Sequence, residues 1–169
     1  MANIRGGGEF GPRWHKAGLK KNRHKVYEDF IAVAEDLIKR KITSPGKLGI
    51  RGGSNGGLLV GVAFTMRPDL FKAVGCAAPL LDMKRYSKLL AGASWIAEYG
   101  DPDIPDMWEY IKTYSVVVPV FPANADFMVC HTNVAHLIRV GKFFTPCRAT
   151  ILQSFPGNSS GLVSRVSMR

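Results

Sequence analysis

The sequence has no apolar run as long as the ~18–20 residues that a membrane-spanning helix needs. Its first residues lack the apolar core of a secretory signal peptide. It has only three cysteines, at positions 76, 130 and 147, and none of them belongs to a C-x-x-C pair. These absences argue against a membrane partner, a disulfide-stapled miniprotein and a zinc site of the C-x-x-C type. We expect thiols in the reducing environment of the cytoplasm.

The composition is that of a globular protein. The chain has 169 residues, of which 46% are hydrophobic and 21% are charged, which is close to ordinary globular usage. This length suits one domain with a sizeable core. A disordered tail and a collagen-like repeat are therefore excluded.

The chain is basic, with 23 Lys and Arg residues against 13 Asp and Glu and a formal net charge of +10. Part of this excess lies in one cluster, made up of Lys16, Lys20, Lys21, Arg23 and Lys25. No aromatic residues alternate with these cations, as they do on a stacking platform for nucleic acid bases. We therefore expect a solvated basic loop and no nucleic acid partner.

Hydrophobic spacing predicts an amphipathic helix followed by a strand–helix–strand unit. Between residues 27 and 41, apolar side chains share one helical face, with acids near the start and cations at the end, as the helix dipole favours. A strand is predicted over 47–51, an apolar helix over 58–66 and a buried strand over 72–78. Such a crossover implies an α/β fold, a parallel sheet with helices on both faces.

The remaining segments are less regular. Residues 1–25 are rich in glycine and are expected to form a loop. Residues 84–91 and 107–114 suit short helices, and residues 116–120 and 127–130 are strand candidates.

The run Gly52-Gly53-Ser54-Asn55-Gly56 fits the pattern G-x-S-x-G. This pattern forms a sharp strand-to-helix turn with the serine at its tip. Ser54 is therefore a candidate nucleophile, and the Asn55 N–H a candidate oxyanion donor at the start of a helix. The alternative is a glycine-rich turn that cradles a phosphate, but neither a Gly-Lys-Ser/Thr ending nor a G-x-G-x-x-G spacing is present.

Several sequence blocks in one order make the chain resemble the catalytic domain of the prolyl oligopeptidase family: Ala2–Gly11, Trp14-His15, Gly52–Gly57, Arg67–Phe71, Asp82-Met83 and Ser94–Gly100. The resemblance covers residues 2 to about 115. It implies a partial α/β-hydrolase fold and a serine peptidase that acts on short peptides, in many members after proline, with no cofactor and no metal. The family's β-propeller domain and the first strands of its hydrolase sheet are expected to be missing here.

The same resemblance implies roles for individual residues. Ser54 is the nucleophile and the Asn55 N–H one oxyanion donor. Trp95 resembles the indole that stacks on the proline ring of the substrate, and Tyr99 and Leu80 resemble other walls of that pocket. A flat apolar ring such as proline suits an aromatic face, although without the family Trp95 is equally a core or surface aromatic residue.

A catalytic triad also needs an acid and a histidine after the serine, and the family's Asp-Asp-Arg and Gly-His motifs are absent. His131 and His136 are the two histidines that follow Ser54, and Asp126 is the one acid in the unmatched segment. Asp126 with either histidine is the remaining combination. Because the family's acid and base lie on loops after different strands, we expect His131 to be an ordinary surface or core histidine.

The match stops at Tyr114-Ser115. Residues 116–169 carry five cations and a single acid, a composition that a shifted reading frame would produce. We expect a partial catalytic domain over 1–115 and an unmatched basic tail over 116–169. The predicted function is a serine peptidase of the prolyl oligopeptidase type, incomplete and therefore weakly active or inactive. The alternative is a non-catalytic remnant or basic binding module.

Overall fold

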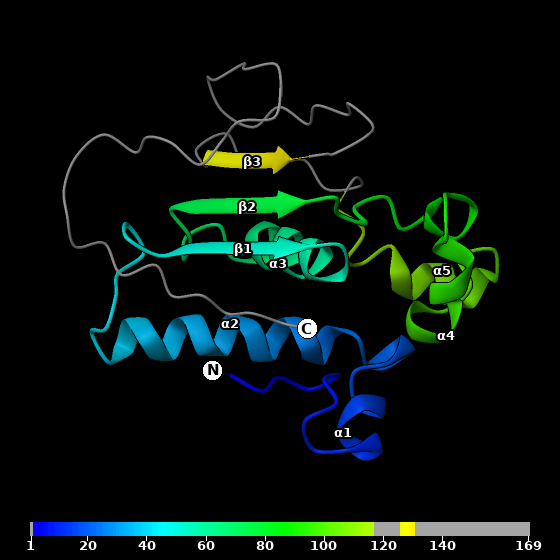
Figure 1. The fold of residues 1–169 in the computed structure, drawn as a ribbon, viewed down its shortest axis with the longest axis horizontal. Coiled ribbons are helices and arrows are strands. Elements are labelled where there is room, and N and C mark those ends of the chain that lie inside the picture. Colours follow the sequence, from blue (N-terminus) through cyan, green and yellow to red (C-terminus); the bar gives the residue numbers. More distant parts are fainter. Residues whose placement is uncertain (1, 117–125, 131–169) are drawn as a thin grey trace.

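The structure is a computed structural model that describes residues 2–116 and the backbone of the strand 126–130. Its elements, in chain order, are α1 (Pro12–Lys16), η1 (Lys20–Asn22), α2 (His24–Lys39), β1 (Gly49–Gly53), α3 (Asn55–Met66), β2 (Ala73–Ala77), η2 (Tyr86–Lys88), η3 (Gly92–Trp95), α4 (Ile96–Tyr99), α5 (Pro105–Ile111) and β3 (Asp126–Cys130). Figure 1 shows them as a sheet edged by helices, with α4 and α5 beyond the carboxyl ends of β1 and β2.

The three described strands form a parallel sheet in the order β1-β2-β3. β1 and β2 are joined through α3, which packs on both strands. This is the strand–helix–strand unit that the sequence predicts, so the α/β fold is confirmed (Figure 1). In the described part of the chain, α3 covers one face of β1 and β2, and α2 packs against α3.

The core gathers around α3, which is apolar on every side. Its residues from Gly57 to Phe64 are all buried. The neighbouring α2 is amphipathic and turns one face inward, formed by Val26, Tyr27, Phe30, Ile31 and Ala34. A helix that is apolar all round needs cover on all sides. β1, β2 and α2 pack on α3, and Pro79, Leu81 and Val116 lie against its glycines Gly57 and Gly61.

The helix predicted over 27–41 is observed as α2, displaced toward its amino end. It starts at His24, whose backbone N–H is satisfied by the hydroxyl of Tyr110 at 2.9 Å. It stops at Lys39, and Lys41 then takes a left-handed conformation with φ of 58°. Sequence spacing alone cannot reveal the tyrosine hydroxyl that caps the first turn.

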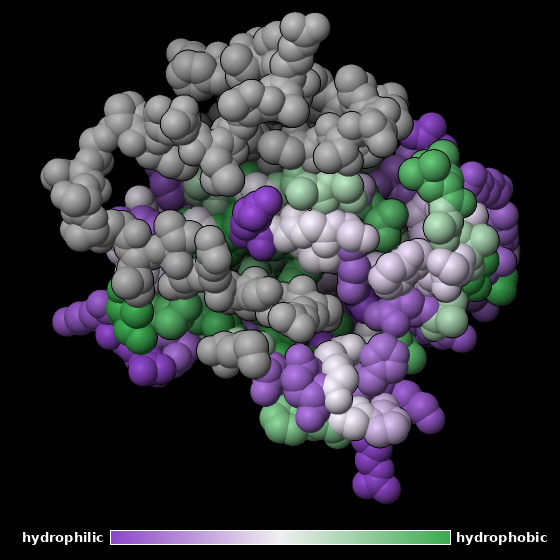
Figure 2. Space-filling view, in the orientation of Figure 1, coloured by the Kyte–Doolittle hydropathy of each residue, from purple (hydrophilic) through white to green (hydrophobic). Residues whose placement is uncertain are grey.

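The loop predicted over the first 25 residues is wrong in part, because α1 and η1 form there. Pro12 occupies the first turn of α1 and follows Gly11, whose φ is 80°. Proline is pre-organised for that position. The basic cluster therefore lies on α1, η1 and the start of α2, and Figure 2 shows hydrophilic residues gathered over α1.

Other predicted elements shift by a few residues. The strand predicted over 47–51 is β1, and the helix predicted over 58–66 begins earlier, at Asn55. Of residues 84–91, three form the 3-10 helix η2. The strand candidate at 127–130 lies within β3, and the one at 116–120 lies mostly outside the described residues.

Candidate active site

Ser54 lies at a sharp turn between β1 and α3, at the carboxyl edge of the sheet. It is exposed, and its backbone has φ of 53° and ψ of −117°. A left-handed conformation is uncommon for a non-glycine residue, and such strain gathers at functional sites. The Ser54 N–H donates to the Ala77 carbonyl at the end of β2, 2.9 Å away. The structure thus has the strand-to-helix turn that the G-x-S-x-G pattern predicts.

The turn requires glycine at two positions. A Cβ atom on Gly52 would lie 2.0 Å from the Gly56 carbonyl oxygen, and one on Gly57 would lie 2.8 Å from Pro79 Cβ. Gly56, by contrast, has no atom within 4 Å of an added Cβ. The close approach of β1 to the start of α3 therefore rests on Gly52 and not on every glycine of the run.

Asn55 is the first residue of α3, so its N–H precedes the hydrogen-bonded ladder of the helix. The positive end of the helix dipole lies at the same point. An oxyanion formed next to Ser54 would accept a hydrogen bond from the Asn55 N–H and lie at the positive end of the helix dipole. This is the arrangement expected for an oxyanion donor.

The Asn55 side chain belongs to a buried polar cluster that the sequence did not reveal. Its Oδ1 atom accepts hydrogen bonds from Arg23 Nη2 at 2.5 Å and from the Tyr99 hydroxyl at 2.6 Å. Arg23 is 2% exposed and also donates to the Glu98 carboxylate. Its guanidinium lies 4.8 Å from the centre of the Tyr99 ring.

Burial raises the pKa of Tyr99, against the opposing influence of Arg23. The hydroxyl therefore keeps its proton, which it needs to donate to Asn55. The pKa of Arg23 is raised too: burial acts to lower it, but the phenols of Tyr27 and Tyr99 and the Glu98 carboxylate outweigh that cost. The cluster is thus a cation, a carboxylate, an amide and a neutral phenol.

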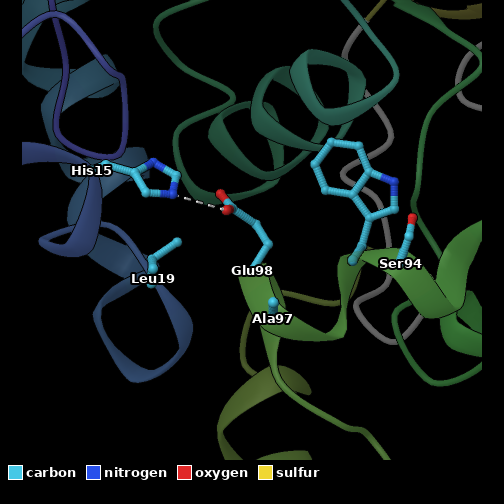
Figure 3. A pocket seen from close by; sticks show the side chains of 6 residues that line it. His15, Leu19, Ser94, Ala97 and Glu98 are labelled. Carbon is cyan, nitrogen blue, oxygen red and sulfur yellow. Dashed lines mark ion pairs between the residues drawn. The ribbon is translucent and has the colours of Figure 1, made fainter. Parts of the chain in front are cut away.

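A shallow pocket lies next to Glu98, on the side away from the buried Arg23 (Figure 3). It is lined by His15, Leu19, Ser94, Trp95, Ala97 and Glu98. The carboxylate of Glu98 points toward His15, and the His15 Nε2 atom is 3.7 Å from Glu98 Oε2. The other ring nitrogen of His15 is 2.8 Å from the Gly6 carbonyl, so this histidine is held by the loop that precedes α1.

The expected pocket residues lie in different surroundings. Trp95 is half-buried, lines the pocket of Figure 3 and stacks on the Tyr99 ring, with centroids 5.7 Å apart. Tyr99 is fully buried, so in this structure it supports Trp95 and Asn55 from behind. Leu80 is half-buried and packs against the core.

Of the candidate partners of Ser54, the structure describes only the backbone of Asp126, and it lies at the other end of the sheet. Asp126 begins β3 level with Ala73 and Gly49, at the amino end of the sheet, whereas Ser54 follows the carboxyl end of β1. At about 3.3 Å per strand residue, their backbones are roughly 16 Å apart along the strands. His131 and His136 lie outside the described residues. Within residues 2–116, no side chain hydrogen-bonds the Ser54 hydroxyl.

Arg23 and Glu98 are the site residues that the sequence reasoning missed. Arg23 stands among Lys20, Lys21 and Lys25 and was expected on the surface with them, but it is buried. Its partner Glu98 is 75 positions away. The one available signal was that Glu98 lies in the block Ser94–Gly100, between Trp95 and Tyr99.

The described residues contain no helix long and apolar enough to cross a membrane. Nor do they bring together three or more His, Cys, Asp or Glu side chains that could hold a metal ion.

The comparisons with known proteins agree with the motifs. The model of the "Prolyl oligopeptidase family" matches residues 1–134. An uncharacterized peptidase of Rickettsia prowazekii is 60% identical over 115 residues, which cover 68% of this chain and 16% of that protein. A dual function macrocyclase-peptidase of Galerina marginata is 43% identical over 174 residues, which cover 98% of this chain and 23% of that protein.

Among solved structures, a post-proline cleaving enzyme from Rickettsia typhi is similar, with a TM-score of 0.72 and 54% identity. The match covers 75% of this chain and 18% of that one. The chain therefore spans less than a quarter of the length of these relatives.

Proposed function

The chain belongs to the prolyl oligopeptidase family, and from that premise we propose that it carries the nucleophile turn of a serine peptidase that cleaves short peptides after proline. The observation that carries the proposal is the turn itself. Ser54 is exposed, strained and placed between the end of β1 and the start of α3. Residues 1–115 form, in this proposal, a partial catalytic domain. That boundary stays a prediction, because the family match continues to residue 134.

In the proposed reaction, Ser54 Oγ attacks the carbonyl carbon of the peptide bond that follows proline. The hydroxyl proton passes to a base, and the carbonyl oxygen becomes an oxyanion next to the Asn55 N–H. The peptide C–N bond then breaks, the amine leaves with a proton, and an acyl-enzyme remains on Ser54. Water hydrolyses this ester and restores the serine.

Trp95 supports the proline preference. Its indole is half-buried and is braced by stacking on the buried Tyr99 ring. A rigid aromatic face next to a shallow pocket suits a flat apolar ring. We propose Trp95 as the proline contact and Leu80 and Tyr99 as the apolar surroundings that hold it.

We further propose that this chain reacts slowly. Among residues 2–116 no carboxylate or imidazole hydrogen-bonds the Ser54 hydroxyl, and a serine without its base loses several orders of magnitude in rate. Asp126 with His131 stays a candidate for the acid and base of Ser54, and substitution of the histidines tests it. Activity that survives both His131→Ala and His136→Ala would remove these histidines from the mechanism.

Labelling with a fluorophosphonate probe tests the nucleophile. Wild type should be labelled, even if slowly, and Ser54→Ala should lose the label completely, because the phosphorus bonds to the serine oxygen. Ser44→Ala is the matched control, since Ser44 is an exposed serine in the turn before β1. Equal labelling of wild type and Ser54→Ala, or none in either, would reject the proposal for this chain.

A second probe tests the substrate class. A phosphonate that carries a prolyl group should label wild type faster than Trp95→Ala by about tenfold, the scale of one lost aromatic contact. The plain fluorophosphonate should label the two proteins within about twofold of each other. An equal loss with both probes would mean that Trp95 supports the fold and not the choice of proline.

One observation favours the alternative of a basic binding module. Lys16, Lys20 and Lys21 are all exposed on α1 and η1. Retention on heparin as a function of salt tests this, because contacts between cations and an anionic polymer weaken as ionic strength rises. Absence of salt-dependent retention would remove the alternative.

A further inference from the structure

Arg23 is a buried cation immediately behind the nucleophile turn. It lies at the junction of η1 and α2, and its side chain is 3% exposed. Its two hydrogen-bond partners come from other elements, Glu98 from α4 and Asn55 from α3. A buried charge is costly unless it is paired and hydrogen-bonded. These contacts therefore account for the presence of an arginine at this position.

The chemistry of Arg23 fixes the Asn55 side chain in one orientation. A guanidinium only donates hydrogen bonds, so the amide atom that faces it must be the oxygen. That oxygen has two lone pairs, and Arg23 Nη2 and the Tyr99 hydroxyl occupy both. The amide can neither flip nor rotate without losing two partly buried hydrogen bonds.

We propose that Arg23 is a positioning residue for the nucleophile turn: by holding the Asn55 amide and the Glu98 carboxylate together, it fixes the first turn of α3 against α4. Asn55 directly follows Ser54, and the Ser54 carbonyl accepts the N–H groups of Gly57 and Leu58 at 3.0 and 3.2 Å. A shift of Asn55 therefore moves the turn that carries the nucleophile and the oxyanion donor. This role rests on the proposed function of Ser54 for its catalytic consequence.

The same residue connects the turn to the pocket of Figure 3. Glu98 lines that pocket between His15 and Trp95, and Arg23 contacts Glu98 from the buried side. α4 has only four residues and directly follows Trp95, and the ion pair between Arg23 and Glu98 ties it to the junction of η1 and α2. Arg23 thereby sets the spacing between the proposed proline contact and the proposed nucleophile.

Only arginine fits this role. Its planar fork can reach two acceptors on different elements at once, whereas the single ammonium of lysine is a point charge on a flexible stem. Arg23→Lys keeps the charge beside Glu98 but loses the second arm toward Asn55. This conservative variant therefore separates the effect of the positive charge from the effect of the hydrogen bond to Asn55.

Amide hydrogen exchange of the Gly57 and Leu58 N–H groups tests the proposal without any need for activity. In Arg23→Met and in Arg23→Lys we expect both amides to exchange about tenfold faster, because the first turn of α3 opens more often. The amides of Ala34 and Leu37, in the second half of α2, should stay within about twofold of wild type.

Arg67→Met is the matched control. Like Arg23, Arg67 contacts two side chains, here the acids Glu35 and Asp69, but it lies at the exposed end of α3. It should leave the exchange of Gly57 and Leu58 unchanged. Unchanged exchange in folded Arg23 variants would overturn the proposal. Global unfolding of both Arg23 variants would do the same, because Arg23 would then support the whole fold.

Fluorophosphonate labelling separates this proposal from the proposed function. If wild type is not labelled, Ser54 is not a nucleophile in this chain, and hydrogen exchange still decides the role of Arg23. If wild type is labelled, Arg23→Lys should be labelled about tenfold more slowly. In the Asn55→Leu background, Arg23→Lys should slow labelling no further, since the contact between Arg23 and Asn55 that it removes is already absent there. Additive effects of the two changes would contradict the proposal.

Discussion

The two ends of α3 both meet an arginine with carboxylate partners, yet they differ in every other respect. At the start of the helix, Arg23 is buried, Ser54 is strained, and the two terminal nitrogens of Arg23 donate to Glu98 and Asn55 inside the protein. At the far end, Arg67 pairs with Glu35 and Asp69 in solvent. The same ion-pair chemistry therefore has two uses. The buried pair at the start of α3 holds neighbouring elements together, whereas the exposed pairs at its far end add little to the stability.

The largest effect is expected where the backbone itself is crowded at the start of α3. Gly52→Ala would place a Cβ atom 2.0 Å from the Gly56 carbonyl oxygen, so β1 and α3 must move apart. We expect a loss of about 4 kcal/mol or more in the free energy of unfolding, at the upper end for single substitutions. Urea unfolding followed by circular dichroism measures it, and a loss below about 1 kcal/mol would show that the turn is loose.

The two arginines provide the direct test of the comparison. Arg23→Met leaves the Glu98 carboxylate partly buried without its main partner, and such a change costs about 3 kcal/mol in unfolding free energy. Arg67→Met removes an exposed arginine, and the urea midpoint should shift far less than in Arg23→Met. Similar midpoint shifts for both variants would abolish the distinction between the two ends.

A smaller effect of opposite sign is expected at Gly56. This glycine lies in the first turn of α3, and an added Cβ would meet no atom within 4 Å. Gly56→Ala should therefore raise the free energy of unfolding by about 0.5–1 kcal/mol, because alanine loses less backbone entropy in a helix. Destabilisation instead would mean that the start of α3 is more crowded than the structure shows.

The smallest effect concerns pH at the exposed end. The hydrogen bond from Arg67 lowers the pKa of Asp69 below its ordinary value of 3.8. The stability that this pair adds is therefore present above about pH 4 and is lost as the pH falls through the lowered pKa. Thermal midpoints of wild type and Asp69→Asn should converge on going from pH 6 to pH 2.5, and also in 1 M NaCl at pH 6. A constant difference would place the effect of the substitution elsewhere.

The sequence predicts what depends on neighbouring residues. The alternation of apolar and charged positions after Tyr27 predicts α2, and the glycines around Ser54 predict the turn, since the crowding at Gly52 is a contact between residues four positions apart. The short helix α1 was missed because its signal, Pro12 after Gly11, lies in a glycine-rich segment. The polar cluster was missed for a different reason. Arg23 and Glu98 meet only after the chain has folded, and no local pattern separates a buried arginine from the lysines beside it.

The long separation between Arg23 and Glu98 also has a consequence for the order of folding. β1, α3 and β2 follow one another directly in the chain, so their contacts close short loops. The contact between Arg23 and Glu98 joins residues 75 positions apart, and the entropy cost of closing a loop grows with its length. The serine turn can therefore take shape early in folding, with the strand–helix–strand unit. The contact between Arg23 and Glu98 forms later, when α4 docks against the junction of η1 and α2.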